Sequence, residues 1–405
     1  MRIGLFIDTY YPMIDGVINV VDNYAKHLLK YGEVIVFCPL VDNTEIKDKP
    51  YKVVQCKSFS VVGIDYSLPT PQIDNAFKKA LKNSNLDVVH IHSPFTVGAA
   101  GVAYAKKRKI PVVATLHSQY KQDFERAVKL KLPVSVAMAN VMHVFNSCDE
   151  CWTVNEDIRR LYVEEYKLTA PCKLVFNATA HKPIENVQES AMRVNKLYNL
   201  TEDQSLYLFV GRINYLKGVD LIARALKIVK QSGQPFKMIF VGTGQDEDDL
   251  KKLVSELNLE NEIIFAGKIE DTNLLMDLYS RAKLFLFPSL YDANSLVQIE
   301  AAAQSTPTLF LKGAKTASLI THDKNGFLSE NSPEEYAKQI LRIENDNELY
   351  QKVCKGARQT LYLSWEQTVE HVYKKYLKLR VIARRKRLLH SFRKGYKTRM
   401  FKSLK

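Results

Sequence analysis

Short runs of β-branched and aromatic residues alternate with helix-length stretches along most of the chain, and this alternation restricts the possible folds strongly. In the first half, the strand-like runs cover residues 2–8, 33–39, 51–56, 88–93, 112–118, 151–155 and 173–178. Stretches long enough for helices separate several of them, such as 17–31, 72–83 and 96–109. Strands and helices that alternate in this way form βαβ units with parallel strands and right-handed crossovers. We therefore predict an α/β fold, with a Rossmann-like, doubly wound first domain at residues 1–178.

The alternation is lost at residues 179–203 and then starts again. There, proline and polar residues replace the apolar pattern, so we expect a linker with a short helix. The second series has strand-like runs at 206–212, 237–243, 262–268, 284–289, 308–312 and 327–330, and helix-like stretches at 218–231, 246–257, 273–281 and 295–303. We predict a second doubly wound domain at residues 204–364. Because ligands bind at the carboxyl ends of such strands, the expected site is a cleft between the two domains.

The net charge of +14 is confined to the C-terminal end of the chain. The last acidic residue is Glu370, and residues 371–405 contain fourteen Lys or Arg residues, so the rest of the chain has no net charge. A protein that binds nucleic acid over its whole body would spread its basic residues, so no specific nucleic-acid partner is expected. We expect residues 365–378 to form a helix that crosses back to the first domain, and residues 379–405 to form a basic tail.

The tail has apolar residues at every fourth position, with basic residues between them. These apolar residues are Leu388, Phe392, Tyr396, Met400 and Leu404. The pattern is typical of a basic amphipathic helix on an anionic membrane surface. Two other interpretations stay open: a helix that packs this stripe on the body, and a tail that binds nucleic acid without specificity. The basic and then apolar stretch at 129–145 is a second membrane candidate, or else a helix that packs in the core.

Three features favour the cytoplasm. Asp8 follows the first apolar residues before a signal-peptide core can form. No apolar run reaches the ~18–20 residues of a membrane span. The six cysteines show no paired framework, which fits a reducing compartment. We expect a cytoplasmic protein that is attached peripherally to the inner face of the cell membrane.

Two cations follow the first strand of the second domain. That strand ends at Gly211, Arg212 comes next, and Lys217 opens the following helix. Cations at a strand end and a helix N-terminus suit a diphosphate, although a pair of solvated surface residues fits as well. The next strand ends in Val-Gly-Thr-Gly around Gly242. Small residues there let a backbone approach a phosphate or a sugar, although a tight turn also needs glycine.

Two carboxylates flank the start of a later helix. Asp292 lies in the loop before that helix and Glu300 lies two turns into it, about 12 Å apart at the rise of a helix. This exceeds the separation of about 5–9.5 Å between the paired carboxylates of a glycosidase. It fits a ligand with a hydroxylated group at each end and a diphosphate between, such as a nucleotide sugar. The amides at 294–296 could meet the phosphates, but a capping acid and a surface charge would give the same pattern.

The first domain adds a glycine turn and histidines at strand ends. Asp15 and Gly16 follow the first strand, and His90, His92 and His117 end two others. Histidines at two strand ends facing one cleft favour a functional role, although a single histidine is more often structural. We expect no metal site: the Asp-Glu-Asp run at 246–248 lies in the first turn of a helix, where acids complement the dipole.

The ordered motifs resemble those of the family 4 retaining glycosyltransferases, which have the GT-B fold. They are Val-Gly-Arg with Lys-Gly at 210–218, Val-Gly-Thr-Gly at 241–244 and the paired acids at 292–300. Met-Arg-Ile-Gly at 1–4, His-Ile-His-Ser-Pro-Phe at 90–95 and Ala-Thr-Leu-His-Ser at 114–118 are most similar to diacylglycerol glucosyltransferases and phosphatidylinositol mannosyltransferases. The resemblance implies two Rossmann-like domains that face each other across a cleft.

The resemblance also implies roles for individual residues. Arg212 and Lys217 would hold the donor diphosphate and stabilise the leaving group without a metal or another cofactor, and Glu300 would bind the ribose. His117 and Asp292 would contact the donor sugar. The implied donor-binding set is Gly16, Gly211, Arg212, Lys217, Gly242, Asn294, Ser295, Leu296 and Glu300.

The sequence departs from the family pattern at Asp292, where members usually have Glu, and at Asn294 and Ser295, where Phe-Gly is frequent. We expect a membrane-associated retaining enzyme that moves a hexose, with glucose favoured, from a uridine diphosphate sugar to a lipid such as diacylglycerol. One alternative is the same donor chemistry on a glycan, a polyprenyl-linked or a protein acceptor in envelope polysaccharide synthesis. Another is a catalytically silent GT-B subunit with a binding or assembly role.

Overall fold

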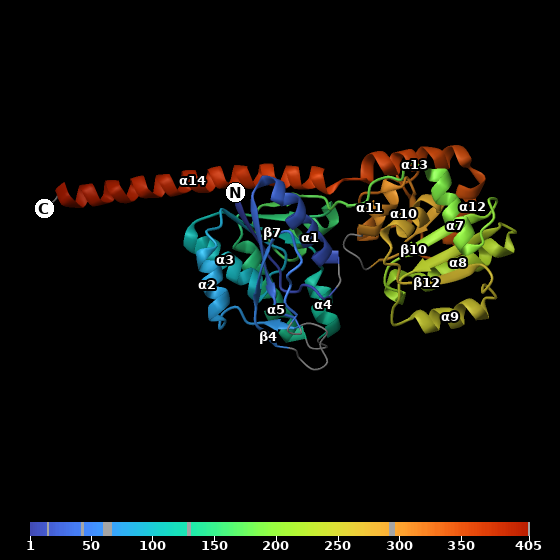
Figure 1. Ribbon diagram of the computed structural model, residues 1–405, viewed down its shortest axis with the longest axis horizontal. Coiled ribbons are helices and arrows are strands. Elements are labelled where there is room, and N and C mark those ends of the chain that lie inside the picture. The colour runs from blue at the N-terminus through green and yellow to red at the C-terminus, as the bar shows by residue number, and fades with distance from the viewer. Residues whose placement is uncertain (14–15, 42–43, 60–66, 128–130, 291–295, 404–405) are drawn as a thin grey trace. The chain divides into compact units, whose positions relative to one another are not determined.

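The computed structural model describes residues 1–13, 16–41, 44–59, 67–127, 131–290 and 296–403 (Figure 1). The chain divides into two compact units. Unit 1 comprises Met1–Asn177 together with Trp365–Lys405, and unit 2 comprises Ala178–Ser364. The C-terminal helix therefore belongs to the same unit as the N-terminal residues.

The sheet of unit 1 has seven parallel strands. Their order across the sheet is β3(Lys52–Cys56), β2(Glu33–Pro39), β1(Arg2–Phe6), β6(Val88–Ile91), β7(Val112–Leu116), β8(Glu150–Thr153) and β9(Cys172–Leu174). In the register of the central strands, Ile3 lies opposite Val34 on one side and Val88 on the other. The chain winds outward from β1 in both directions, which is the predicted doubly wound topology.

Helices connect these strands and cover the sheet. They are α1(Gly16–Leu28), η1(Leu29–Tyr31), α2(Asn75–Asn83), α3(Thr96–Arg108), α4(Tyr120–Ala127), α5(Lys131–Asn146), α6(Glu156–Arg160) and η2(Leu161–Glu165). Every residue of β6, β7 and β8 is buried, which explains why β6 and β7 are mainly apolar in sequence, whereas β8 also buries Glu150. A small antiparallel pair, β4(Ser58–Phe59) and β5(Leu68–Pro69), was not predicted.

The apolar stretch after residue 131 forms α5 and packs inward. Val134, Val141, Met142 and Phe145 are buried in unit 1. Val136, on another face of the helix, is exposed. The described side chains of α5 therefore favour the interpretation of a core-packing helix.

Among the described side chains of helix α14(Trp365–Ser403), those buried against unit 1 all lie in its first half. Trp365, Val369, Val372, Tyr376 and Leu379 are buried against the unit. Beyond them the helix extends past the rest of unit 1 (Figure 1), and the described side chains of Leu388 and Leu389 are exposed. The side chains of residues 390–405 lie outside the described part, which includes the tail positions from Phe392 to Leu404. Among the described residues, no helix has both the length and the apolar character needed to cross a bilayer.

Unit 2 has six parallel strands with the same winding. Their order is β12(Ile263–Gly267), β11(Phe236–Val241), β10(Ser205–Val210), β13(Leu284–Leu286), β14(Thr308–Leu311) and β15(Phe327–Ser329). Its helices are α7(Val187–Tyr198), η3(Tyr215–Lys217), α8(Val219–Gln231), α9(Glu247–Glu256), α10(Thr272–Arg281), α11(Leu296–Ala303), η4(Lys315–Ala317), α12(Pro333–Asn345) and α13(Asn347–Leu361). The predicted fold class, two doubly wound α/β sheets with a C-terminal helix, is confirmed.

Candidate functional site

The loops after β10 and β11 pack backbone against backbone through glycines. A Cβ atom on Gly242, whose φ is 121°, would lie 2.0 Å from the carbonyl oxygen of Gly211. A Cβ atom on Gly244 would lie 2.0 Å from the carbonyl oxygen of Ile213. These glycines are therefore required by the contact between the two loops. Because the contact brings both backbones to the carboxyl edge of the sheet, it also places their amides where a ligand of this fold binds.

Lys217 extends across the carboxyl ends of two neighbouring strands. It ends η3, and its Cδ lies 3.7 Å from the position of a Cβ on Gly211, beyond β10. Its Nζ lies 5.3 Å from the ring centroid of Phe287, just after β13. Gly218, with a φ of 70°, completes this turn, and a Cβ there would lie 2.8 Å from Cγ of Pro288. Arg212 is exposed in the same loop, so the structure brings both predicted cations to the strand ends.

Asp246 holds the cation-bearing loop in place. The backbone N–H of Tyr215 donates to Oδ2 of Asp246 over 2.8 Å. Beside it, Oδ1 of Asn214 is buried without a hydrogen-bond partner in the described part of the chain. The described residues contain no cluster of His, Cys, Asp or Glu that could hold a metal ion.

Glu300 lies on α11 with 17% of its side chain exposed, and it has two polar neighbours. The hydroxyl of Tyr279 donates to its Oε2 over 3.2 Å, and Nε2 of His181 lies 3.8 Å from its Oε1. Burial raises the pKa of Glu300 to about 7 and lowers the pKa of His181. Near neutral pH the carboxyl group can therefore carry a charge and accept hydrogen bonds from hydroxyl groups.

The sequence did not predict that His181 lies beside Glu300. Gln304 fixes the segment that carries His181: its Oε1 accepts from the N–H of Ile184 over 2.9 Å, and its Nε2 donates to the carbonyl oxygen of Lys182 over 2.9 Å. The predicted linker therefore lies against the end of α11. No local pattern indicated this contact, because more than a hundred residues separate the partners.

In unit 1, two of the predicted histidines form a direct pair. His92 follows β6 and His117 follows β7, and Nδ1 of His92 shares a hydrogen bond of 3.0 Å with Nε2 of His117. Burial lowers the pKa of His92 well below its usual value and lowers the pKa of His117 to about 3. Both rings are therefore neutral at pH 7. His117 is only partly buried, so its ring can still accept or donate a hydrogen bond to a ligand.

His90 has a structural role. Its Nε2 is 2.7 Å from Oγ1 of Thr115, and its Nδ1 is 2.6 Å from the hydroxyl of Tyr376 on α14. Its ring also lies 4.0 Å, between centroids, from the ring of His92. The residue thus connects the docked half of α14 to the histidine pair, and both of its ring nitrogens are used within the protein.

The remaining predicted residues divide between described and undescribed positions. Gly16 begins α1 and is exposed, with open space where a Cβ would be. Leu296 begins α11 and is partly buried. Asp292, Asn294 and Ser295 lie outside the described residues, so the predicted separation of Asp292 and Glu300 stays a prediction.

Two family models match consecutive parts of the chain. Residues 14–180 match "Glycosyltransferase Family 4", and residues 194–360 match "Glycosyl transferases group 1". Solved structures with the same fold include the Anabaena protein HepE in complex with UDP-glucose, with a TM-score of 0.71 and 16% identity, covering 93% of this chain and all of that one.

Curated relatives give the same assignment. The "Alpha-monoglucosyldiacylglycerol synthase" of Acholeplasma laidlawii is 26% identical over 373 residues, 88% of this chain and 92% of that protein. The enzyme of the same name from Streptococcus pneumoniae is 25% identical over 321 residues, 76% of this chain and 70% of that protein. The fold and the two family models define a glycosyltransferase of the GT-B class. The chain belongs to glycosyltransferase family 4.

Proposed function

We propose that the protein is a retaining, metal-independent glucosyltransferase that transfers glucose from UDP-glucose to diacylglycerol at the surface of an anionic membrane. The observation that carries the donor assignment is the loop from Gly211 to Lys217, which brings two cations to the carboxyl edge of the sheet of unit 2. The donor nucleotide is further supported by HepE, whose structures contain UDP, glucose or UDP-glucose.

The donor contacts follow from the chemistry of these side chains. Arg212 and Lys217 bind the diphosphate and neutralise the charge that develops on it as the glycosidic bond breaks. The first amides of α11, from Leu296 on, add hydrogen-bond donors at a helix N-terminus. As a carboxylate, Glu300 accepts hydrogen bonds from the ribose hydroxyl groups. Since these cations supply the positive charge that the leaving group needs, the proposed reaction requires no divalent metal.

The proposed reaction breaks the bond between the anomeric carbon and the phosphate oxygen, and forms a bond from that carbon to the acceptor oxygen on the same face. The proton of the acceptor hydroxyl passes to the departing phosphate oxygen, so no protein base is needed. Neutral His117 contacts the sugar as a hydrogen-bonding group. Asp292 is assigned the second sugar contact by its position in the family motif.

The lipid acceptor is supported by the names of two relatives and by the tail. Both relatives are alpha-monoglucosyldiacylglycerol synthases, and UDP-glucose is itself an α-glucoside, so a similar product implies retention. Residues 371–405 contribute fourteen cations and no acid, each worth about 1 kcal/mol near an anionic surface. We propose that α14 attaches the enzyme peripherally to the inner face of the cell membrane.

The test measures UDP release by the purified full-length protein. Four donors are compared, namely UDP-glucose, UDP-galactose, UDP-N-acetylglucosamine and GDP-mannose. Each is supplied with phosphatidylcholine–phosphatidylglycerol vesicles with or without diacylglycerol. We expect release from UDP-glucose only with diacylglycerol, an α-linked product by NMR, and no loss of rate in EDTA. Arg212→Ala should lower the rate about 100-fold or more, whereas Arg224→Ala, which removes an exposed arginine on α8, should not.

Each rival function gives a different result. Release with soluble glycan acceptors alone would contradict the lipid acceptor while leaving the donor assignment intact. A β-linked product would contradict retention, and complete loss of activity in EDTA would contradict metal independence. Failure to bind or turn over any of the four donors, with Arg212→Ala behaving like the parent protein, would indicate a catalytically silent subunit.

A further inference from the structure

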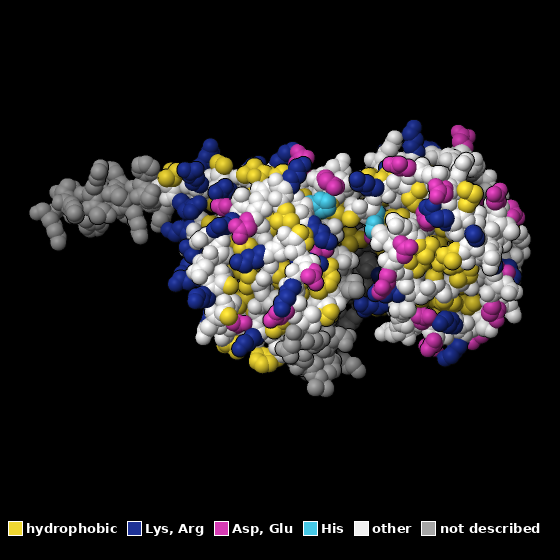
Figure 2. Space-filling model, in the orientation of Figure 1, with side chains coloured by type: hydrophobic (Ala, Val, Ile, Leu, Met, Phe, Trp, Pro, Cys, Tyr) yellow, Lys and Arg dark blue, Asp and Glu magenta, His cyan; other side chains and the backbone are white. Residues whose placement is uncertain are grey.

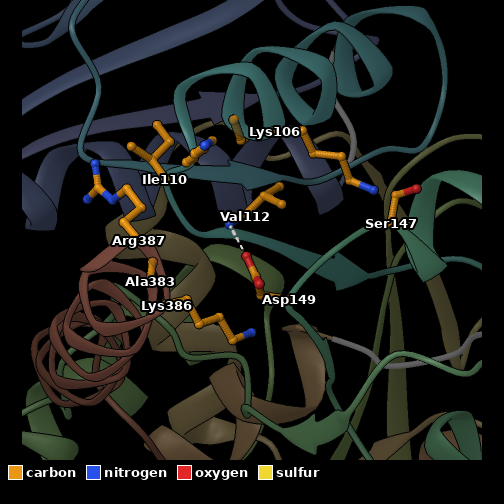
Figure 3. A pocket seen from close by; sticks show the side chains of 10 residues that line it. Lys106, Ile110, Val112, Ser147, Asp149, Ala383, Lys386 and Arg387 are labelled. Carbon is orange, nitrogen blue, oxygen red and sulfur yellow. Dashed lines mark hydrogen bonds between the residues drawn. The ribbon is translucent and has the colours of Figure 1, made fainter. Parts of the chain in front are cut away.

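A basic pocket lies where α14 passes the amino edge of the sheet of unit 1 (Figure 3). Its volume is about 340 Å³. Its lining comes from the end of α3, the loop into β7, the loop from α5 into β8, and one face of α14. The charged residues of the lining are Lys106, Lys109, Asp149, Lys386 and Arg387. In Figure 3, Lys386 extends from α14 toward Asp149, and Lys106 extends from α3 toward Ser147.

The lining of this pocket carries four basic side chains and one carboxylate. Its one carboxylate, Asp149, already accepts a hydrogen bond from the N–H of Val112 over 3.0 Å. In the described part of the chain, no ion pair joins a carboxylate to any of the four basic side chains, whereas Arg380, nearby on α14, is paired with Asp87 at 2.7 Å.

Stabilisation of a helix C-terminus explains only two of these four cations. Lys106 and Lys109 lie at the C-terminus of α3, where basic residues complement the helix dipole. Lys386 and Arg387 come from the interior of α14, far from either of its ends, so no dipole accounts for them. All four side chains are exposed, so water and salt screen their mutual repulsion, and an anion bound among them would offset what remains.

An apolar groove continues from this pocket. It has a volume of about 1050 Å³, runs between α14, the C-terminal end of α3 and the amino end of β6, and shares Ile110 and Arg387 with the pocket. Its apolar lining includes Leu86, Leu377, Val381 and Leu388, and the charged side chains along it are Asp87, Arg108, Arg380, Arg384 and Arg387. Figure 2 shows Lys and Arg side chains gathered along this edge of unit 1.

We propose that the basic pocket and the apolar groove together bind one molecule of anionic phospholipid, with its phosphate group in the pocket and an acyl chain in the groove. A free phosphate or a sugar phosphate would use the pocket and leave the groove empty, whereas a phospholipid fills both. The inference rests on the proposed function for its membrane, which supplies the lipid. The proposed membrane attachment depends on the summed charge of α14, whereas the phospholipid proposed here occupies a single saturable site.

This lipid is not the acceptor of the transferred sugar. His117 lies after the carboxyl end of β7, whereas Val112, which lines the pocket, lies at its amino end. The five residues of β7 separate these edges by roughly 16 Å, at about 3.3 Å per residue. The bound phospholipid therefore anchors α14 on unit 1, away from the chemistry.

The test is a titration of the full-length protein with dihexanoylphosphatidylglycerol below its micelle concentration, followed by isothermal calorimetry. We expect saturable binding of one molecule. The double variant that combines Lys106→Gln and Lys386→Gln should raise the dissociation constant of the lipid at least tenfold. The matched control, Lys107→Gln with Lys378→Gln, removes the same charge from the same two helices outside both hollows, and should change the dissociation constant less than twofold. Ala383→Phe keeps every charge but fills the pocket, and should also weaken binding.

Three results would overturn the proposal: no saturable binding, an equal loss in the pocket variant and its control, or inorganic phosphate that binds as tightly as the lipid. The last would indicate a free anion as the ligand. UDP-glucose affinity, measured in the same variants, should be unchanged. If the parent protein lacks that affinity, the proposed donor is wrong, and the lipid site is judged separately by its own titration.

Discussion

Nδ1 of His92 lies 3.0 Å from Nε2 of His117, so the histidine assigned to the sugar is held by a second histidine on the neighbouring strand end. The contact occupies Nε2 of His117 and leaves its Nδ1 for a ligand. His92 itself is fully buried, and its own Nε2 has no partner among the described residues. We therefore regard His92 as a positioning residue for His117.

Replacement of His92 tests this relationship. His92→Phe keeps an aromatic ring in the same space but removes the hydrogen bond to His117, whose ring is then free to rotate. A lost hydrogen bond of about 1–1.5 kcal/mol corresponds to roughly a tenfold fall in kcat, and the KM for the donor should change little, because the proposed nucleotide site lies in unit 2. His143→Phe, at an exposed position on α5, is the control. Equal kcat values for His92→Phe and the parent enzyme would refute the positioning role.

The hydroxyl of Tyr376 should stabilise the docking of α14. Tyr376→Phe leaves Nδ1 of the buried His90 without its 2.6 Å partner, which costs about 1–3 kcal/mol of unfolding free energy. Tyr373→Phe is the matched control, because Tyr373 stacks on Tyr31 at 4.3 Å through its ring. Urea unfolding of both variants checks this. The docking role is wrong if the two variants unfold at the same urea concentration as the parent.

The apolar runs made the two sheets predictable. Buried parallel strands such as β7 expose neither face, so their sequences are continuously apolar and stand out from the amphipathic helices. The same logic placed Arg212, Lys217 and His117 at the carboxyl ends of strands. The short pair β4 and β5 escaped prediction because two residues give no periodicity.

Contacts distant in sequence were the unpredictable part of the candidate site. His90 meets Tyr376 across 286 positions, and the pairing of His181 with Glu300 depends on how the segment before α7 lies on α11. The pattern gave the residue types at each strand end, but the tertiary packing decided which of them touch. The tertiary structure also shows that Gly242 packs directly against the carbonyl oxygen of Gly211, a contact that the motif alone did not reveal.

Glu300 should make stability depend on pH. Burial raises its folded-state pKa to about 7, above the value of about 4.3 in an unfolded chain. The folded protein therefore binds the proton more tightly, and the unfolding free energy falls as pH rises between these two values. Glu300→Gln removes this loss, so it should raise the melting temperature at pH 8, by the equivalent of about 1–3 kcal/mol, and change it little at pH 4.5. Calorimetry at both pH values checks the sign.

The same substitution should weaken donor binding, because the neutral amide cannot replace a carboxylate at the ribose. Glu334→Gln, at an exposed position in the first turn of α12, serves as the control for both measurements. A stabilisation by Glu300→Gln that is larger at pH 4.5 than at pH 8 would contradict the assigned pKa.

Gly242→Ala should be costly, because the new Cβ would lie 2.0 Å from the carbonyl oxygen of Gly211 and must push the two loops apart. We expect a loss of about 2–4 kcal/mol of unfolding free energy and weaker UDP-glucose binding. Gly233→Ala is the matched control: its φ of 84° is also positive, but nothing lies within 4 Å of its Cβ position. It should lose only the strain of about 1 kcal/mol. Equal losses in both would mean that backbone strain alone makes Gly242 necessary.

Removal of the tail should separate membrane attachment from folding. The cut belongs after Leu389, because Leu379 is buried and Arg380 pairs with Asp87, so a shorter chain would lose contacts of the folded unit. A chain that ends there lacks six cations but keeps the docked half of α14. We expect the same melting temperature and much weaker co-sedimentation with phosphatidylglycerol vesicles, since each cation near the surface is worth about 1 kcal/mol. Neutral phosphatidylcholine vesicles, which should bind neither chain, are the control. If the shortened chain binds anionic vesicles as tightly as the full chain, residues 390–405 are not the attachment segment.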